Sequence, residues 1–332
     1  MLNFETDGWV VEVDRMVHLS NPHATNYSEI EKATTKLVKH YHRYQHEFIT
    51  TSSDSDETVR ELQTTATEGD LVIVGGGEAT VNIAAKAATT GLRGEIIPHL
   101  ILPGGNKNDL ANSLHVNVLK NLIGTIDSAR DLATIYPLET HIDFVDAKEP
   151  RDEVAVSYLD IGALSEIASL ENELRTGKIA KIARSYEFTR WIHDAVIAIQ
   201  GLAIASTFKL QDNKLKDSKP FQLIDYGYIN GSRLAGFIET RVTSSELKSV
   251  RVEQPRMLDL IVEGLELAIS SSGGQIVENI DDDFTLKSHT HTKMHYDGEV
   301  IALTPGDRIK IKRSSRPFYV LKNKRDRKKF QD

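Results

Sequence analysis

The chain has 332 residues, with 48 acidic and 40 basic side chains, a formal net charge of −8 and no cysteine. This length accommodates two domain cores, and the acidic balance argues against general nucleic-acid binding. A chain without cysteine forms no disulfide and no thiolate metal site. We find no apolar run of the roughly 18 residues that span a bilayer, and the acidic first residues do not resemble a secretory signal. We therefore expect a cytoplasmic protein.

The first 70 residues alternate between strand and helix patterns. One or two strands are predicted over residues 9–19, and Ser28 with Glu31 forms a capping-box pattern that predicts the start of a helix. Residues 47–51 form the next predicted strand, and the helix after it ends at Gly69. This alternation predicts an open, mostly parallel α/β sheet.

Two glycine-rich loops follow neighbouring predicted strands. Residues 71–74 are continuously apolar, as in a strand buried on both faces, and lead into Gly75, Gly76 and Gly77. A helix is predicted next, and the strand over residues 96–102 then ends in Pro-Gly-Gly. Such loops let backbone N–H groups approach a phosphate, at the carboxyl edge where α/β sheets bind ligands. The two loops together predict one nucleotide site built from two sides.

The pattern changes after residue 137. Short strand patterns with few crossover helices predict an antiparallel second domain. Helices are expected at residues 185–205 and 257–270. We expect an α/β domain over residues 1–137, a β-rich substrate or lid domain over 138–315, and a basic tail over 316–332. The predicted strands of the second domain cover residues 141–147, 153–161, 207–210, 221–229, 247–252, 275–280, 285–286, 300–303 and 308–312.

The basic tail has three interpretations. It can be a solvated, frayed terminus, or pack back on the first domain. It can also contact an anionic membrane surface, where each basic residue contributes about 1 kcal/mol. Its clustered cations are Lys322, Lys324, Arg325, Arg327, Lys328 and Lys329.

Two common nucleotide motifs do not fit the first glycine loop. In a Rossmann fingerprint a third glycine would stand where Thr80 stands, and the loop would follow the first strand rather than the third. A P-loop requires Gly-Lys-Ser/Thr, which is missing after these glycines.

Five markers resemble the diacylglycerol kinase catalytic domain family. Residues 76–82, Gly-Gly-Glu-Ala-Thr-Val-Asn, are similar to that family's Gly-Gly-Asp-Gly-Thr-x-Asn loop. Residues 103–111, Pro-Gly-Gly-Asn-Lys-Asn-Asp-Leu-Ala, are similar to its Pro-x-Gly-Thr-x-Asn-Asp-Phe/Leu-Ala. The remaining markers, in the family's order, are Asn21-Pro22, Thr51 and Asp297-Gly298-Glu299.

The resemblance implies an NAD kinase-like α/β domain followed by an antiparallel β-sandwich-like domain, with ATP between them. It also implies a Mg²⁺-dependent transfer of the γ-phosphoryl group of ATP to a hydroxyl of a lipid such as diacylglycerol. Phosphoryl transfer depends mainly on positioning and on neutralising charge, which suits such loops. The implied nucleotide-binding residues are Thr51, Gly76, Gly77, Glu78, Ala79, Thr80, Asn82, Gly105, Asn106, Asn108 and Asp109.

Glu78 and Glu299 are the candidate chemical groups. Glu78 matches the family's aspartate, and a carboxylate beside polyphosphate suggests a Mg²⁺ ligand. The alternative is that Glu78 only complements the N-terminus of the following helix. The resemblance makes Glu299 a general base for the acceptor hydroxyl, with Asp297 as substitute, although Asp-Gly is also a common hairpin turn.

Three histidines near the end of the second domain suggest a possible metal site. On a regular strand His289, His291 and His295 share one face and could bind zinc, or they could simply form an exposed strand face.

Several positions depart from the family pattern. Glu78 replaces aspartate, Ala79 replaces a glycine that a positive φ would require, and Asn106 replaces threonine. Residues 244–247 lack the paired aspartates of a structural Mg²⁺ site. These departures favour the alternative of a catalytically impaired, nucleotide-binding regulatory or scaffold protein.

Overall fold

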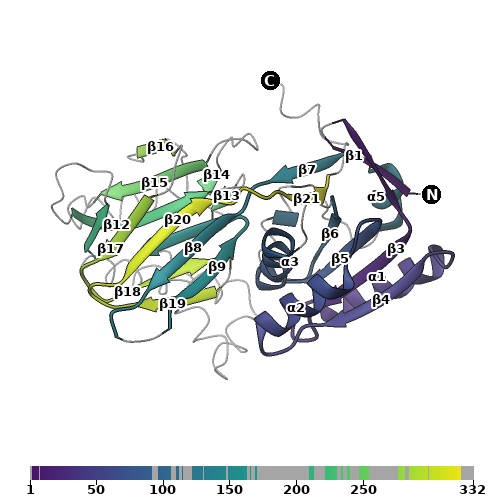
Figure 1. Cartoon of the computed structure of the whole chain (residues 1–332), viewed down its shortest axis with the longest axis horizontal. Coiled ribbons are helices and arrows are strands. Elements are labelled where there is room, and N and C mark those ends of the chain that lie inside the picture. Colours follow the sequence, from purple (N-terminus) through teal and green to yellow (C-terminus); the bar gives the residue numbers. More distant parts are fainter. Residues whose placement is uncertain are drawn as a thin grey trace, which may run out of the picture. The chain divides into compact units, whose positions relative to one another are not determined.

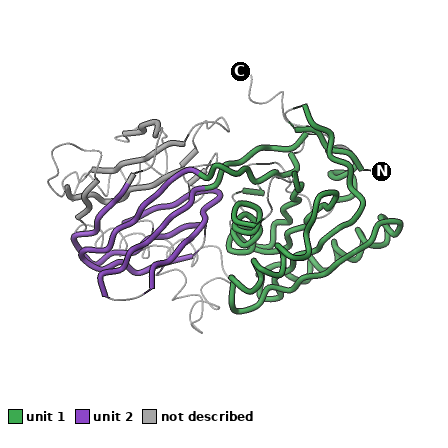
Figure 2. The backbone as a smooth tube through the Cα atoms, in the orientation of Figure 1, with its two compact units in different colours: residues 1–137, 230–236, 314–332 green, residues 138–229, 237–313 purple. Residues whose placement is uncertain are grey.

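The computed structural model forms two compact units (Figures 1 and 2). Unit 1 comprises residues 1–137, 230–236 and 314–332, and unit 2 comprises residues 138–229 and 237–313. Within them the structure describes residues 2–6, 8–91, 96–105, 110–111, 114, 122–129, 131–146, 149–162, 165, 169, 285–297 and 299–322, and otherwise only the backbone of strands between residues 209 and 284. The predicted helices at 185–205 and 257–270, and residues 244–246, lie outside this part of the chain.

Unit 1 is built on a sheet in the order β4-β3-β5-β6-β21-β7. Its neighbours run parallel from β4 to β21, and β7 is antiparallel to β21. This arrangement confirms the predicted open, mostly parallel α/β sheet. The strands are β3 Arg15–Ser20, β4 Gln45–Thr50, β5 Asp70–Gly76, β6 Pro98–Pro103, β7 Leu132–Ile135 and β21 Phe318–Leu321.

Three helices connect these strands where the sequence predicts them: α1 Tyr27–His40, α2 Ser55–Thr65 and α3 Glu78–Thr90. The short helix α5 Leu122–Ser128 is not predicted from the sequence. The strand order reverses between β3 and β5, because α1 leads outward to β4 and α2 returns past β3. Ligands in open α/β sheets bind outside the carboxyl ends of the strands at such a reversal. Both glycine loops lie at this edge.

The start of α1 corrects the capping-box prediction. The helix begins at Tyr27, so Asn26 occupies the cap position and Ser28 lies inside the first turn. The backbone N–H of Asn26 donates to the Gly104 carbonyl oxygen at 3.1 Å. A contact with a distant loop therefore fixes the helix start, which a local pattern does not report.

A hairpin precedes the first sheet strand. β1 (Leu2–Thr6) and β2 (Trp9–Val13) pair antiparallel, with Thr6 opposite Trp9. Alternate residues of the hairpin, Phe4 and Val13 among them, are buried. The Thr6 hydroxyl lies 3.4 Å from that of Thr134 in β7, so the hairpin packs beside that end of the sheet.

Unit 2 is antiparallel at every described pairing, which confirms the predicted class of the second domain. Its buried apolar cluster includes Leu138, Leu159, Leu286, Met294 and Ile309. The strands are β8 Leu138–Asp143, β9 Arg151–Ala155, β10 Tyr158–Gly162, β11 Lys209–Asp212, β12 Phe221–Ile229, β14 Ile238–Glu239, β15 Leu247–Glu253, β16 Ile276–Ile280, β17 Phe284–Ser288, β18 Thr292–Tyr296, β19 Glu299–Leu303 and β20 Arg308–Arg313. The two-residue strand β13 Arg233–Leu234 belongs to unit 1.

One predicted strand is in fact two. Residues 153–161 lie in β9 and β10, separated by a turn at Val156 and Ser157. Neither glycine nor proline marks this turn.

None of the helices that the structure describes is long and apolar enough to cross a membrane.

Candidate functional site

The two glycine loops touch at the carboxyl edge of the sheet. The Gly104 N–H donates to the Gly76 carbonyl oxygen at 2.8 Å, because β5 and β6 are neighbours. A Cβ atom on Gly104 would stand 2.7 Å from that oxygen and 2.5 Å from Ile30 of α1. Only glycine permits this approach. The structure thus brings together the two loops that the sequence pairs.

Helix α3 begins directly at the first loop, with Gly77 at its cap position. The first N–H groups of a helix have no intrahelical partner and carry partial positive charge, so they attract an anion. A Cβ on Gly77 would lie 3.5 Å from the Gly105 Cα, an ordinary contact. The space at Gly77 is therefore less restricted than at Gly104.

Glu78 and Ala79 occupy the first turn of α3. Asp297 is the one non-glycine residue with positive φ in the described chain, so Ala79 has ordinary helical geometry. The replacement of glycine at this position therefore carries no backbone strain. Glu78 is partly buried, where the helix N-terminus favours its negative charge.

Thr80 and Asn82 lie on the buried side of α3. The Asn21 amide donates to the Thr80 hydroxyl at 3.4 Å, and a Cβ on Gly76 would stand 2.2 Å from that hydroxyl. Thr80 therefore packs over the glycine loop. The Asn82 amide has neither a donor nor an acceptor partner among the residues that the structure describes. A buried amide without a partner is costly, so this group favours a polar ligand or water.

Asn21, one of the five family markers, also lies at the candidate site, although its motif alone does not place it there. Its backbone N–H donates to the Gly75 carbonyl oxygen at 2.9 Å, and its side chain reaches Thr80. Asn21 thus connects the end of β3 with the first glycine loop across the reversal of the strand order. Asn-Pro directly after the first strand is the signal that could have identified it.

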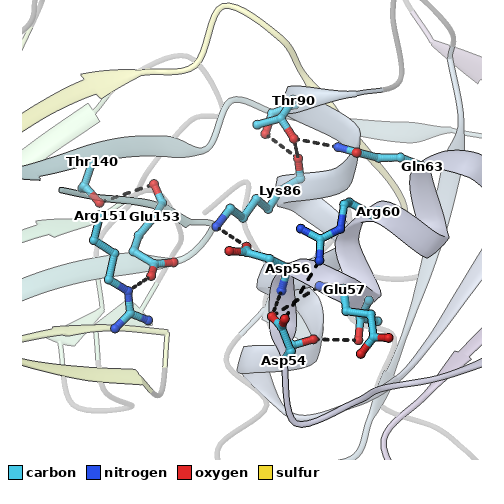
Figure 3. Close-up of polar contacts among 12 residues, drawn as sticks. Asp54, Asp56, Glu57, Arg60, Gln63, Lys86, Thr90, Thr140, Arg151 and Glu153 are labelled. Carbon is cyan, nitrogen blue, oxygen red and sulfur yellow. Dashed lines mark hydrogen bonds and ion pairs between the residues drawn. The ribbon is translucent and has the colours of Figure 1, made fainter. Parts of the chain in front are cut away.

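Thr51 lies at the same edge, after β4. Its N–H donates to the Ser20 carbonyl oxygen at 2.9 Å. The chain then enters α2, where the Asp54 carboxylate caps the helix by accepting from the N–H groups of Asp56 and Glu57. Figure 3 shows this cap and the ion pair, 2.9 Å long, between Lys86 of α3 and Asp56.

The second glycine loop is described as far as Gly105. The Asn26 amide lies 3.5 Å from the Gly105 carbonyl oxygen, so both glycines of this loop contact Asn26. Of the predicted nucleotide-binding residues, Asn106, Asn108 and Asp109 lie outside the described residues.

Unit 2 holds the candidate base in a charged cluster. Glu299 begins β19 and stands opposite Tyr296 of β18. The Arg151 guanidinium pairs with Glu153 and lies 3.3 Å from the Tyr296 hydroxyl (Figure 3 shows Arg151 with Glu153). Thr140 fixes β9 through a 3.3 Å bond to the Glu153 carbonyl oxygen.

The cluster shifts the protonation of Glu299. Glu299 is exposed at the start of β19, yet partial loss of water raises the pKa of its carboxyl; Arg151 opposes that shift, and the negative charge of Glu153 adds to it. Burial likewise raises the pKa of Tyr296, which keeps its hydroxyl protonated. A carboxyl with a raised pKa accepts a proton more readily than an ordinary glutamate.

Asp297 has a structural role. Its buried carboxylate accepts hydrogen bonds from the backbone N–H groups of Val156, Ser157 and Tyr158. These bonds create the unmarked turn between β9 and β10. Since its lone pairs are engaged by the backbone, Asp297 is a weak candidate for proton transfer.

The three histidines do not share a strand face. β18 begins at Thr292, so His289 and His291 precede it, and His295 is buried with its ring 3.1 Å from the Asp160 carboxylate. The described residues contain no group of three His, Cys, Asp or Glu side chains that could hold a metal ion.

The chain thus combines a mostly parallel sheet that carries paired glycine loops with an antiparallel unit. Residues 15–135 match the family model of the diacylglycerol kinase catalytic domain, which confirms the resemblance seen in the motifs. The chain is similar over 96% of its length to 99% of a solved diacylglycerol kinase structure from Bacillus anthracis str. Sterne, with 14% identity and a TM-score of 0.58.

Two further solved structures from that strain cover the same shares, with 14% and 15% identity and a TM-score of 0.62 each. At this identity the similarity establishes the fold. No curated protein matches the chain.

Proposed function

We propose that the protein is an ATP-dependent lipid kinase that phosphorylates a hydroxyl of a lipid such as diacylglycerol. The observation that carries the proposal is the 2.8 Å contact between the two glycine loops at the N-terminus of α3, inside the segment that matches the family. Paired N–H-rich loops at a helix N-terminus suit a polyphosphate. Such a kinase works in the cytoplasm, where ATP is available.

The residues of unit 1 fit a nucleotide. Gly76 and Gly104 let Thr80 and the two loops pack closely at the N-terminus of α3, and the Asn82 amide has neither a donor nor an acceptor partner among the described residues. In the proposal Gly76, Gly77 and Thr80 hold the phosphates, with Thr51 and Gly105 nearby. Asn106, Asn108 and Asp109 are proposed contributors from the same family motif.

Glu78 is the proposed Mg²⁺ ligand. Mg²⁺ in kinases is usually bound by one or two carboxylates together with phosphate oxygens, so one protein carboxylate suffices. Held there, the ion would supply positive charge against the negative phosphate oxygens.

Glu299 is the proposed general base. It accepts the proton of the acceptor hydroxyl as that oxygen forms a bond to the γ-phosphorus, while the bond between the γ-phosphorus and the β–γ bridging oxygen breaks and ADP leaves. The raised pKa of Glu299 favours this proton uptake. The ordinary helical geometry of Ala79 removes one of the departures that favour an inactive scaffold.

The test is turnover with Mg-ATP and vesicles that contain diacylglycerol. We expect Glu299→Gln to lower kcat by about 10²–10⁴-fold, the usual contribution of a general base. Stabilisation by ATP in a thermal-shift titration should persist, because unit 1 is unchanged. Exposed Glu149 is the matched control, and Glu149→Gln should behave as wild type.

Two outcomes would contradict the proposal. Turnover retained in Glu299→Gln removes the base from the mechanism. Stabilisation by nucleotide, with no metal dependence and no turnover in the wild type, supports the regulatory or scaffold alternative.

A further inference from the structure

The tip of the β1–β2 hairpin exposes two adjacent apolar side chains. Trp9 is 67% exposed and Val10 is 61% exposed, whereas Phe4 and Val13 of the same hairpin are fully buried. The apolar side chains on the core-facing side of the hairpin are therefore buried, whereas those at its tip remain exposed to solvent. Tryptophan is concentrated at membrane–water boundaries, because its large ring is apolar and its indole N–H remains hydrated.

This hairpin lies outside the matched catalytic segment. It ends at Val13, and the match to the diacylglycerol kinase catalytic domain begins at residue 15. The family motifs therefore give no reason for an exposed tryptophan here. A burial role within unit 1 is also excluded by its exposure.

The basic C-terminal segment starts beside the same hairpin. Glu5 of β1 forms a β-bridge with Asp131, and the Lys322 N–H donates to the Asp131 carbonyl oxygen at 3.3 Å. Lys322 is the last residue that the structure describes, and it is linked to β1 through Asp131. The residues that follow it are strongly basic, with Lys324, Arg325, Arg327, Lys328 and Lys329.

We propose that this edge of unit 1 docks on an anionic lipid bilayer, with Trp9 and Val10 in the headgroup boundary and the cationic segment on the lipid phosphates. The inference rests on the proposed function, because the proposed acceptor is a bilayer lipid. Stable peripheral binding generally requires two signals, one apolar and one electrostatic. The hairpin tip supplies the apolar signal, and the residues that follow Lys322 in the sequence supply the cations.

The charges near the tip assign separate roles to the two signals. Glu5 and Glu12 are exposed on the hairpin, so the hairpin itself does not attract an anionic surface. The electrostatic attraction comes from the segment after Lys322, where each cation near the surface contributes about 1 kcal/mol. The apolar contact comes from Trp9 and Val10.

Vesicle co-sedimentation of the full chain, without nucleotide, tests the docking. The probes are vesicles of phosphatidylcholine alone and of phosphatidylcholine with phosphatidylglycerol. We expect Trp9→Ser to weaken binding to the anionic vesicles at least about fivefold. A chain that stops after Lys322 should lose the preference for anionic vesicles.

Phe48→Ser provides the matched control. Phe48 is 58% exposed but lies on β4, the other edge strand of the same sheet from β7. This variant should bind vesicles as wild type does. Equal weakening by Phe48→Ser and Trp9→Ser would overturn the proposal, because it would indicate general apolar adhesion.

Fluorescence gives an independent measurement. The chain has two tryptophans, Trp9 and Trp191, so Trp191→Phe leaves Trp9 as the reporter. We expect its emission to shift to the blue with anionic vesicles, and to be quenched when the lipids carry bromine on their acyl chains. An unchanged emission with bound vesicles would overturn the role of Trp9.

The remaining outcomes separate docking from catalysis. If Trp9→Ser binds vesicles as wild type while the lipid is still phosphorylated, the docking proposal fails and the proposed function stands. If wild type shows no turnover but binds vesicles through Trp9, the proposed function fails alone. Self-association that Trp9→Ser abolishes, without vesicle binding, would show that a second copy covers the tip.

Discussion

At the scale of single residues, the glycines of the two loops are not equivalent. A Cβ on Gly104 meets backbone atoms of Gly76 at 2.7 and 2.8 Å, and backbone moves only at a cost. A Cβ on Gly77 meets the Gly105 Cα at 3.5 Å and the Gly105 N at 4.0 Å, both ordinary contacts. The sequence shows only that each loop is rich in glycine. The restriction on Gly104 arises because β5 and β6 are neighbours in the sheet, which brings the two loops together.

This difference predicts a contrast between two alanine variants. Gly104→Ala should lower the free energy of unfolding by about 1–3 kcal/mol, as overpacking of a close contact does. Gly77→Ala should leave that free energy within about 1 kcal/mol of wild type. Urea denaturation measures both. Equal destabilisation would show that the loops do not meet as described.

The cluster around Glu299 predicts the acidic limb of the pH–rate profile. A base must be deprotonated, so activity falls as the pH drops through the pKa of Glu299. Arg151 lowers that pKa and Glu153 raises it. Arg151→Gln should therefore move the acidic limb of kcat to higher pH, and Glu153→Gln should move it to lower pH.

Opposite displacements in the two variants separate an electrostatic effect from general damage. If both variants move the limb in the same direction, or if neither moves it, the limb belongs to another group. Nucleotide stabilisation of each variant, measured by thermal shift, serves as the control for folding.

At the scale of elements, two strands of the first sheet carry buried histidines. Burial lowers the pKa of His18 in β3 to about 4, and that of His99 in β6 to about 4, from an ordinary value of 6.5. His18 stacks on Phe48 with ring centres 4.8 Å apart, and the Nδ1–H of His99 donates to the Tyr319 carbonyl oxygen, 3.1 Å away. Both rings are neutral in the folded protein at pH 7.

These histidines predict loss of stability in acid. As the pH falls below 6.5 the unfolded chain binds protons that the folded chain does not, so the free energy of unfolding decreases. At pH 5 the loss is on the order of 2 kcal/mol for each histidine. Urea denaturation at pH 7 and pH 5 measures it.

Single replacements show which histidine causes the loss of stability in acid. His18→Leu and His99→Leu should each reduce the difference between the two pH values, whereas His23→Asn, at an exposed position, should preserve it. A difference that both leucine variants retain in full would assign the acid sensitivity to carboxylates.

Local patterns identified most elements of unit 1. The continuous apolar run of β5 and the glycines after it were sufficient to predict the strand, the loop and α3. The capping box at Ser28 was wrong because Asn26 bonds to Gly104, a residue far along the chain. The turn between β9 and β10 was missed because the side chain that forms it, Asp297, comes from another part of the sequence.

At the scale of the whole molecule, the sheet of unit 1 depends on a strand from the end of the chain. β21 lies between β6 and β7, and Phe318 is fully buried against the His99 ring, 4.4 Å between centres. The basic composition near the terminus obscured this strand. Pairing between residues more than 200 positions apart has no local signature.

Truncation should therefore have a sharp threshold. A chain that stops after Lys322 retains β21 and should be stabilised by ATP as wild type is. A chain that stops after Ser314 lacks β21, leaves β7 without its neighbour, and should lose both that stabilisation and a cooperative unfolding transition. Circular dichroism and thermal shift measure the two. A cooperative fold in the shorter chain would contradict the described sheet.

The position of β21 also sets the order of events during synthesis. β6 and β7 emerge from the ribosome long before Phe318–Leu321, and about 10–40 s pass before the missing strand follows, at about 5–20 residues per second. Throughout this interval the edges of β6 and β7 that pair with β21 have no partner strand and remain exposed to solvent. The sheet that holds both glycine loops therefore closes only after β21 has been synthesised, and the nascent protein is most vulnerable to aggregation until then.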